Sequence, residues 1–101
     1  MSTSPAGKNI HLVDVVLGKQ PRGWIRKPAH RSFASREWIE GQVKFGKWIT
    51  DKRNPGDSQA PNYLIYVTNV EEGSRVLIKI THYLDSHVSV EHIHLISSRR
   101  R

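Results

Sequence analysis

The sequence predicts a mainly β fold, a small five-stranded barrel that carries a long basic loop. Two observations support this prediction. Five segments are rich in β-branched and aromatic residues, and turn-forming residues separate most of them. Short strands at such spacing are typical of small barrels. The 101 residues suffice for a single domain, expected over residues 9–96, between a tail of small residues (1–8) and a basic tail (97–101).

The first strand is predicted within Asn9–Leu17, an apolar and β-branched run that ends at Gly18. The following segment, Lys19–Ser35, contains two prolines and a glycine, which interrupt regular elements. We expect a long ordered loop here. Because loops of this length are uncommon in small domains and tend to be functional, the loop is a candidate binding element.

The segment Arg36–Lys52 fits two structures. As a strand it alternates, with Ile39, Val43 and Phe45 on one face. As a helix over Ser35–Lys44 it would begin after a serine N-cap and place Ile39 and Val43 on one face. The strand matches more positions, so we predict a strand. The helix would change the fold to the alternative class, α+β with one helix on an antiparallel sheet.

The C-terminal half predicts three further strands. The segment Asp51–Asn62 is rich in proline, glycine, asparagine and aspartate and is expected to form turns. The strands that follow are expected at Tyr63–Val70, Ser74–Leu84 and Val88–Ile96, each with alternating or β-branched residues.

Charge points to a polyanionic partner. The net charge is +7 and the isoelectric point is about 10.2. Between Lys19 and Arg53 there are ten cationic and three acidic residues, together with five of the eight aromatic residues. Cations neutralise phosphates and aromatic rings stack on bases, so this pattern predicts binding to single-stranded nucleic acid, DNA or RNA. The predicted contact residues are Lys19, Arg22, Trp24, Arg26, Lys27, Arg31, Lys44, Lys47, Trp48, Lys52 and Arg53.

The tryptophans of this basic segment need not all bind. Trp38 and Phe45 are expected in the core. For Trp24, which lies in a loop rich in proline and cations, stacking on a base and anchoring the loop are equal alternatives.

The chain has no cysteine, no apolar run long enough to span a membrane and no signal-peptide pattern, so we expect a cytoplasmic protein that does not act at membranes.

Part of the sequence resembles a known family. The run Glu37–Lys47, with its tryptophan and a closing Phe-Gly-Lys, is similar to the central strand of bacterial single-stranded DNA-binding proteins. The segments Gly73–Val76 and Glu91–Ile96 resemble the last two strands of that family and of primosomal replication proteins. This resemblance covers about half of the chain. It implies a barrel of the OB type, a non-catalytic single-strand binder and a homo-oligomer; an SH3-like barrel fits the strand count equally.

A metal-independent ribonuclease is the alternative function. Such an enzyme needs a proton acceptor, a proton donor and cations, which His30, Arg31, Lys27 and Glu37 could supply. A helix at Ser35–Lys44 followed by strands would also resemble barnase- and RelE-like toxins.

The C-terminal histidines are a second group of candidates. His92 and His94 are expected on one face of a strand, a spacing that suits a metal ion, but the cluster from His82 to His94 contains no third ligand at a defined spacing. We therefore predict no metal site. For the favoured function, a binder without catalysis, we predict no cofactor and no catalytic residue.

Overall fold

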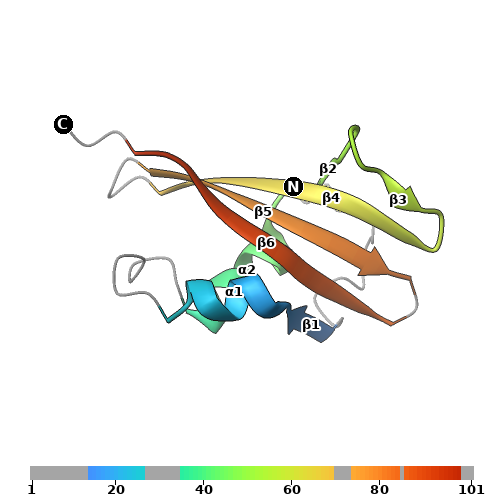
Figure 1. The fold of residues 1–101 in the computed structure, drawn as a ribbon, viewed down its shortest axis with the longest axis horizontal. Coiled ribbons are helices and arrows are strands. Elements are labelled where there is room, and N and C mark those ends of the chain that lie inside the picture. The colour runs from blue at the N-terminus through green and yellow to red at the C-terminus, as the bar shows by residue number, and fades with distance from the viewer. Residues whose placement is uncertain (1–13, 27–34, 70–73, 85, 99–101) are drawn as a thin grey trace.

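The structure is a computed structural model, which describes residues 14–26, 35–69, 74–84 and 86–98 (Figure 1). This part of the chain is mainly β, as predicted, with two helices beside the strands. The strands are β1 (Asp14–Leu17), β2 (Ile49–Thr50), β3 (Gly56–Asp57), β4 (Ala60–Asn69), β5 (Ser74–Tyr83) and β6 (His87–Ser98). The helices are α1 (Lys19–Trp24) and α2 (Arg36–Phe45).

The strands form an open sheet in the order β1-β6-β5-β4-β2, and β3 pairs with β4 outside this path. The long strands β4, β5 and β6 are antiparallel, whereas β1 runs parallel to β6. In the described part of the chain the edge strands β1 and β2 do not pair, so the predicted five-stranded OB- or SH3-like barrel is not formed. The alternative class, a helix on an antiparallel sheet, is closer to the structure.

Four of the five predicted strands are confirmed. The prediction within Asn9–Leu17 corresponds to β1, and its residues 9–13 lie outside the described part of the chain. The other three predictions correspond to β4, β5 and β6. The fifth, over Arg36–Lys52, is wrong, because only Ile49–Thr50 of that segment pairs with the sheet.

Helix α2 occupies most of the segment that was predicted as a strand. Ser35 caps its N-terminus, where the side chain accepts a hydrogen bond of 3.0 Å from a backbone N–H of the first turn. Ile39 and Val43, one turn apart, are fully buried, whereas Phe45 is 75% exposed. A strand would have placed all three side chains on one face, so the helical period governs burial here and the expected core position of Phe45 is wrong.

The prediction of a long loop over Lys19–Ser35 is wrong for its first residues, because Lys19–Trp24 form helix α1. Pro21 is compatible with this helix because it lies in the first turn, where backbone N–H groups have no intrahelical acceptor. Trp24 is only 6% exposed and belongs to the core, so of the two alternatives for this ring the structure supports anchoring. Residues 27–34 of the predicted loop lie outside the described part. Neither helix is long and apolar enough to span a membrane.

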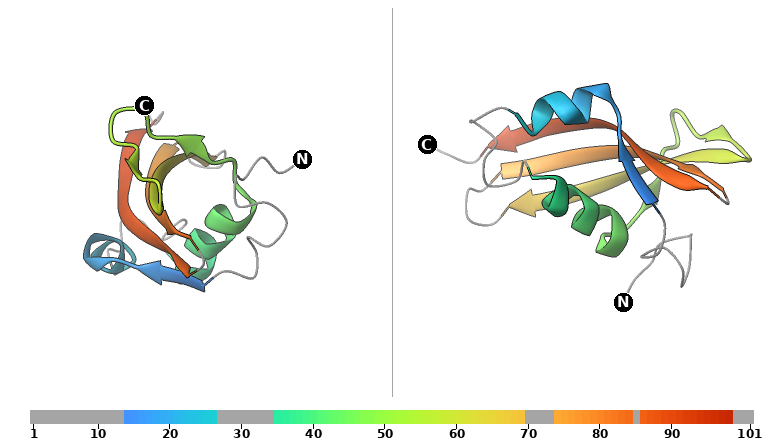
Figure 2. Two further views of the ribbon diagram at one scale, coloured as in Figure 1. Left: turned by 90° about the vertical axis from the view of Figure 1, so that its right-hand side faces the viewer. Right: turned by 90° about the horizontal axis from the view of Figure 1, so that it is seen from below.

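Both helices lie on the same side of the sheet (Figure 1), and the sheet curves around α2 (Figure 2). Strand register places Ile65, Ile78 and Ile93 side by side on this helix-facing side, and all three are buried. We call the opposite side the outer face. Its adjacent rows are Leu64, Lys79 and His92, then Tyr66, Leu77 and His94. The fold therefore places Lys79, two histidines and a tyrosine, together with two leucines, opposite the core.

Candidate nucleic-acid interface

A pocket of about 380 Å³ opens on the outer face, where the sheet meets the loop between β2 and β3. Strands β5 and β6 contribute Lys79, Thr81, Tyr83, Glu91 and His92 to its lining, and the other side carries Asp51, Asn54 and Asn62. Tyr63 and Ile80 complete the lining, which is mostly polar and contains both signs of charge.

A β-bulge in β6 shapes the floor of this pocket. Lys79 pairs with His92 and Ile80 pairs with Val90, so Glu91 has no partner on β5. Val90 and Ile93 are buried, whereas Glu91 and His92 between them are both exposed. In a regular strand neighbouring side chains point to opposite faces, so the extra residue allows both polar side chains to face the pocket.

Helix α1 holds the bulge from the far edge of β6. The backbone N–H of Gly18 donates to Val90 O at 2.9 Å, and a Cβ at Gly18 would lie only 3.0 Å from that oxygen. The Gln20 amide donates to Ile93 O and accepts from Ile93 N, both at 2.9 Å. This side chain thus continues the ladder beyond the end of β1. The two anchors flank Glu91 and His92 and fix the backbone that presents them.

Hydrogen bonds fix the opposite wall of the pocket. Asn62 of β4 donates from its amide to Asn54 O at 2.9 Å and accepts from the Thr81 hydroxyl at 2.6 Å. The Asp51 carboxylate accepts from the backbone N–H of Asn54 at 3.2 Å. These contacts tie the loop between β2 and β3 to β5. They also hold the exposed residues 52–53 beside the pocket.

The histidine pair next to the pocket is stacked. The rings of His92 and His94 have centroids 4.4 Å apart and planes inclined by 17°, which confirms that both project from one face of the strand. Partial burial lowers the pKa of His94 below its ordinary value, and the charges of His92 and Lys79 lower it further. His94 is therefore neutral near neutral pH.

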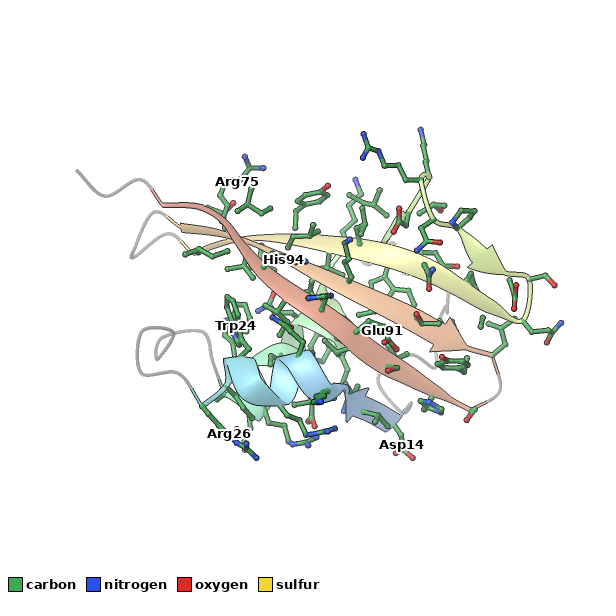
Figure 3. The ribbon with its side chains drawn as sticks, in the orientation of Figure 1. Asp14, Trp24, Arg26, Arg75, Glu91 and His94 are labelled. Carbon is green, nitrogen blue, oxygen red and sulfur yellow. The ribbon has the colours of Figure 1, made fainter. Side chains whose placement is uncertain are left out.

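The predicted contact residues fall into separate groups. On the helix side, Lys19, Arg22 and Arg26 are exposed, Arg22 also donates to Leu17 O at 2.8 Å, and Figure 3 shows Arg26 pointing away from the sheet. Trp24 and Trp48 are buried, and the Trp48 indole N–H donates to Val43 O at 2.8 Å. The remaining placed cations are Lys44 on α2, Lys47 after it, and Lys52 and Arg53 beside the pocket. Lys27 and Arg31 lie outside the described residues.

The residues of the ribonuclease alternative are not assembled in the described structure. His30, Arg31 and Lys27 lie outside it, and Glu37 is exposed on α2, on the helix side. Trp38, expected in the core, is partly buried and packs against it. No group of three histidine or acidic side chains with metal-binding geometry occurs among the described residues.

Sequence reasoning missed the pocket residues of the outer face. Lys79, Thr81, Glu91 and Asn62 come from three strands, and only the register unites them. One local signal was present: two consecutive polar residues, Glu91 and His92, interrupt an otherwise alternating strand between valine and isoleucine. Such an interruption indicates a bulge, and bulges are over-represented next to active sites.

The fold and the site together define a small mainly β protein with an open sheet and a polar outer-face pocket. Comparison of the chain with protein-family models, with curated proteins and with solved structures gave no match.

Proposed function

We propose that the protein binds single-stranded nucleic acid on the outer face of its sheet. The observation that carries this proposal is the strand register, which sets Lys79 beside His92 and, one row on, Tyr66 and Leu77 beside His94. Arg75 lies further along β5, on the side away from the helices (Figure 3). Cations along the face attract phosphates, and the net charge of +7 increases the rate of encounter.

Exposed rings on the same face support single strands as the ligand. Tyr66 is 49% exposed, and Tyr83, at the pocket, is 39% exposed. Bases that are not paired can stack on such rings, at about 1–3 kcal/mol per base. Paired bases inside a duplex cannot. The predicted stacking residues Trp24 and Trp48 are replaced in this proposal by tyrosines, because both tryptophans are buried.

The arrangement of elements also bears on the ribonuclease alternative. Helix α2 is followed along the chain by antiparallel strands. A helix followed by strands is the order of elements that would resemble barnase- and RelE-like toxins. The segment Glu37–Lys47, likened to the central strand of single-stranded DNA-binding proteins, lies mostly in this helix. Cleavage therefore remains a candidate activity of the same protein.

Binding is tested by fluorescence anisotropy with labelled single-stranded RNA and DNA at several salt concentrations. The double variant Arg75→Ala, Lys79→Ala should weaken binding roughly tenfold or more. It should also reduce the salt slope by about 1.4, because each lost phosphate contact on a single strand removes about 0.7.

The matched control, Lys19→Ala with Arg26→Ala, removes the same number of charges from the helix side and should change affinity much less. If the control pair has the larger effect, the nucleic acid lies on the helix side. Undetectable binding at low salt, or binding that does not depend on salt, would contradict the proposal altogether.

A further inference from the structure

Two side chains able to transfer protons enter the pocket from one bulge. Glu91 and His92 are consecutive, exposed and part of the pocket lining. A carboxylate is a proton acceptor and an imidazolium is a proton donor, the two groups that general acid–base catalysis requires. Hydrogen bonds from Gly18 and Gln20 hold the edge of β6 on both sides of the bulge, so the backbone that presents the two groups is fixed.

The same pocket contains the groups that a phosphate would need. Lys79 lies directly across from His92 in the strand register, and neighbouring side chains in such a pair have Cβ atoms about 4.5–5.5 Å apart. Thr81 lies two residues on, with its hydroxyl held by Asn62. An ammonium group on the residue next to a proton donor can neutralise charge that develops on phosphate oxygens.

His94 restrains its neighbour. Its ring stacks on that of His92 with only 17° between the planes, and it is neutral because burial and the charges of His92 and Lys79 lower its pKa. A neutral stacked ring limits the rotation of His92 without adding a second positive charge. His94 is therefore a positioning residue.

We propose that this pocket cleaves single-stranded RNA, with Glu91 as the general base, His92 as the general acid and Lys79 as the group that stabilises the phosphate. The proposal rests on the proposed function, because the same outer face must first bind the strand. It relocates the cleavage site from the segment around His30, where the sequence suggested it, to the sheet.

The chemistry is internal transfer of the phosphoryl group, which needs no metal and no water. Glu91 removes the proton of a ribose 2′-hydroxyl, and the 2′-oxygen forms a bond to the adjacent phosphorus. The bond from phosphorus to the 5′-oxygen of the next nucleotide breaks, and His92 gives its proton to that oxygen. The products are a 2′,3′-cyclic phosphate and a 5′-hydroxyl. DNA, which lacks the 2′-hydroxyl, can bind but cannot react.

The experiment incubates the full chain, in EDTA, with labelled single-stranded RNA, with DNA of the same sequence and with fully 2′-O-methylated RNA. Only the unmodified RNA should be cleaved, to a cyclic phosphate end that mass spectrometry identifies. His92→Ala and Glu91→Gln should each lower the cleavage rate by about 100-fold or more, as loss of a general acid or base does. Both should still bind the DNA strand.

The matched control is Glu37→Gln, on α2, which removes a carboxylate outside the pocket lining and should retain activity. For the positioning role, His94→Ala should lower kcat and His94→Phe, which preserves a stacked ring, should restore most of it. Thermal melts of every variant show whether the fold is retained.

The outcomes separate the two proposals. RNA that is bound but left intact overturns cleavage and leaves the binding proposal standing, whereas absence of binding overturns both. Cleavage that persists in His92→Ala and Glu91→Gln, that requires a metal, or that also consumes DNA contradicts the assigned residues and chemistry.

Discussion

Replacing Gln20 with alanine tests whether α1 holds the bulge in place. Gln20 is partly buried, and its amide forms two hydrogen bonds of 2.9 Å with the backbone of Ile93, one as donor and one as acceptor. The pairing of β1 with β6 ends at Val90, so among the described residues no strand pairs with this edge of β6 at Ile93. The variant therefore leaves that backbone edge without its protein partner.

The expected cost follows from the two bonds. Each hydrogen bond of this kind, between a side chain and the backbone, contributes a net of about 0.5–1.5 kcal/mol, so Gln20→Ala should lower the free energy of unfolding by about 1–3 kcal/mol. Gln20→Glu preserves the acceptor and removes the donor, and it places a carboxylate against the carbonyl of Ile93. We expect it to be at least as destabilising as the alanine variant despite its near-identical shape.

Urea unfolding measures both variants, with an unchanged denaturant slope as evidence that only stability differs. Gln59→Ala, an exposed glutamine in the turn before β4, is the matched control and should stay within about 0.5 kcal/mol. Hydrogen exchange of the Ile93 amide should accelerate in Gln20→Ala more than that of neighbouring core amides. If Gln20→Ala is as stable as Gln59→Ala, the anchor has no energetic role and the reasoning fails.

Two further predictions follow from the core and from the charges of the outer face. Trp24→Ala should lower the free energy of unfolding by about 3–5 kcal/mol in thermal melts, as loss of a buried tryptophan does, while oligonucleotide affinity per folded molecule is unchanged. Lys79→Met should raise the pKa of His94 in a nuclear magnetic resonance titration, because a positive charge that lowers it is removed. The lowered pKa of His94 also makes the stability of the protein depend on pH. The folded protein binds fewer protons at His94 than the unfolded chain, so it loses stability as the pH falls through about 6.5, and Lys79→Met should lose less.

The strands β4, β5 and β6 could be predicted because alternation and turn residues are local properties of the sequence. Alternation gave the wrong prediction for α2. Ile39 and Val43 fit one face of a helix and one face of a strand equally, and Phe45 made the strand pattern match more positions. Phe45 is exposed in the structure, so an apolar residue at the surface produced the false alternation. The serine cap at position 35 was the better local signal, since a cap fits only the helix.

The site could be predicted only in part. The charge density of Lys19–Arg53 predicted a single binding segment, but the described residues of that segment are divided between the helix side and the loop beside the pocket. The pairing of His92 with His94 on one face was predictable from strand spacing and is confirmed. Lys79 and Thr81 were not, because their place beside His92 and Asn62 depends on register between strands that are distant in sequence.

Deleting Glu91 separates the role of the bulge in the fold from its role in the pocket. Without this residue Val90, His92 and Ile93 alternate regularly, so the valine and isoleucine stay in the core and the histidine stays on the outer face. Cooperative unfolding should therefore persist, while cleavage of single-stranded RNA is lost. Deleting Ser89 is the matched control, because it also shortens β6 by one residue. A regular strand would then form only if Val90 turned outward and Glu91 turned into the core, where a charge costs several kcal/mol. Circular dichroism melts compare the two deletions. If loss of Glu91 unfolds the protein as loss of Ser89 does, the extra residue serves the fold, and its place in the pocket gives no reason to assign it a catalytic role.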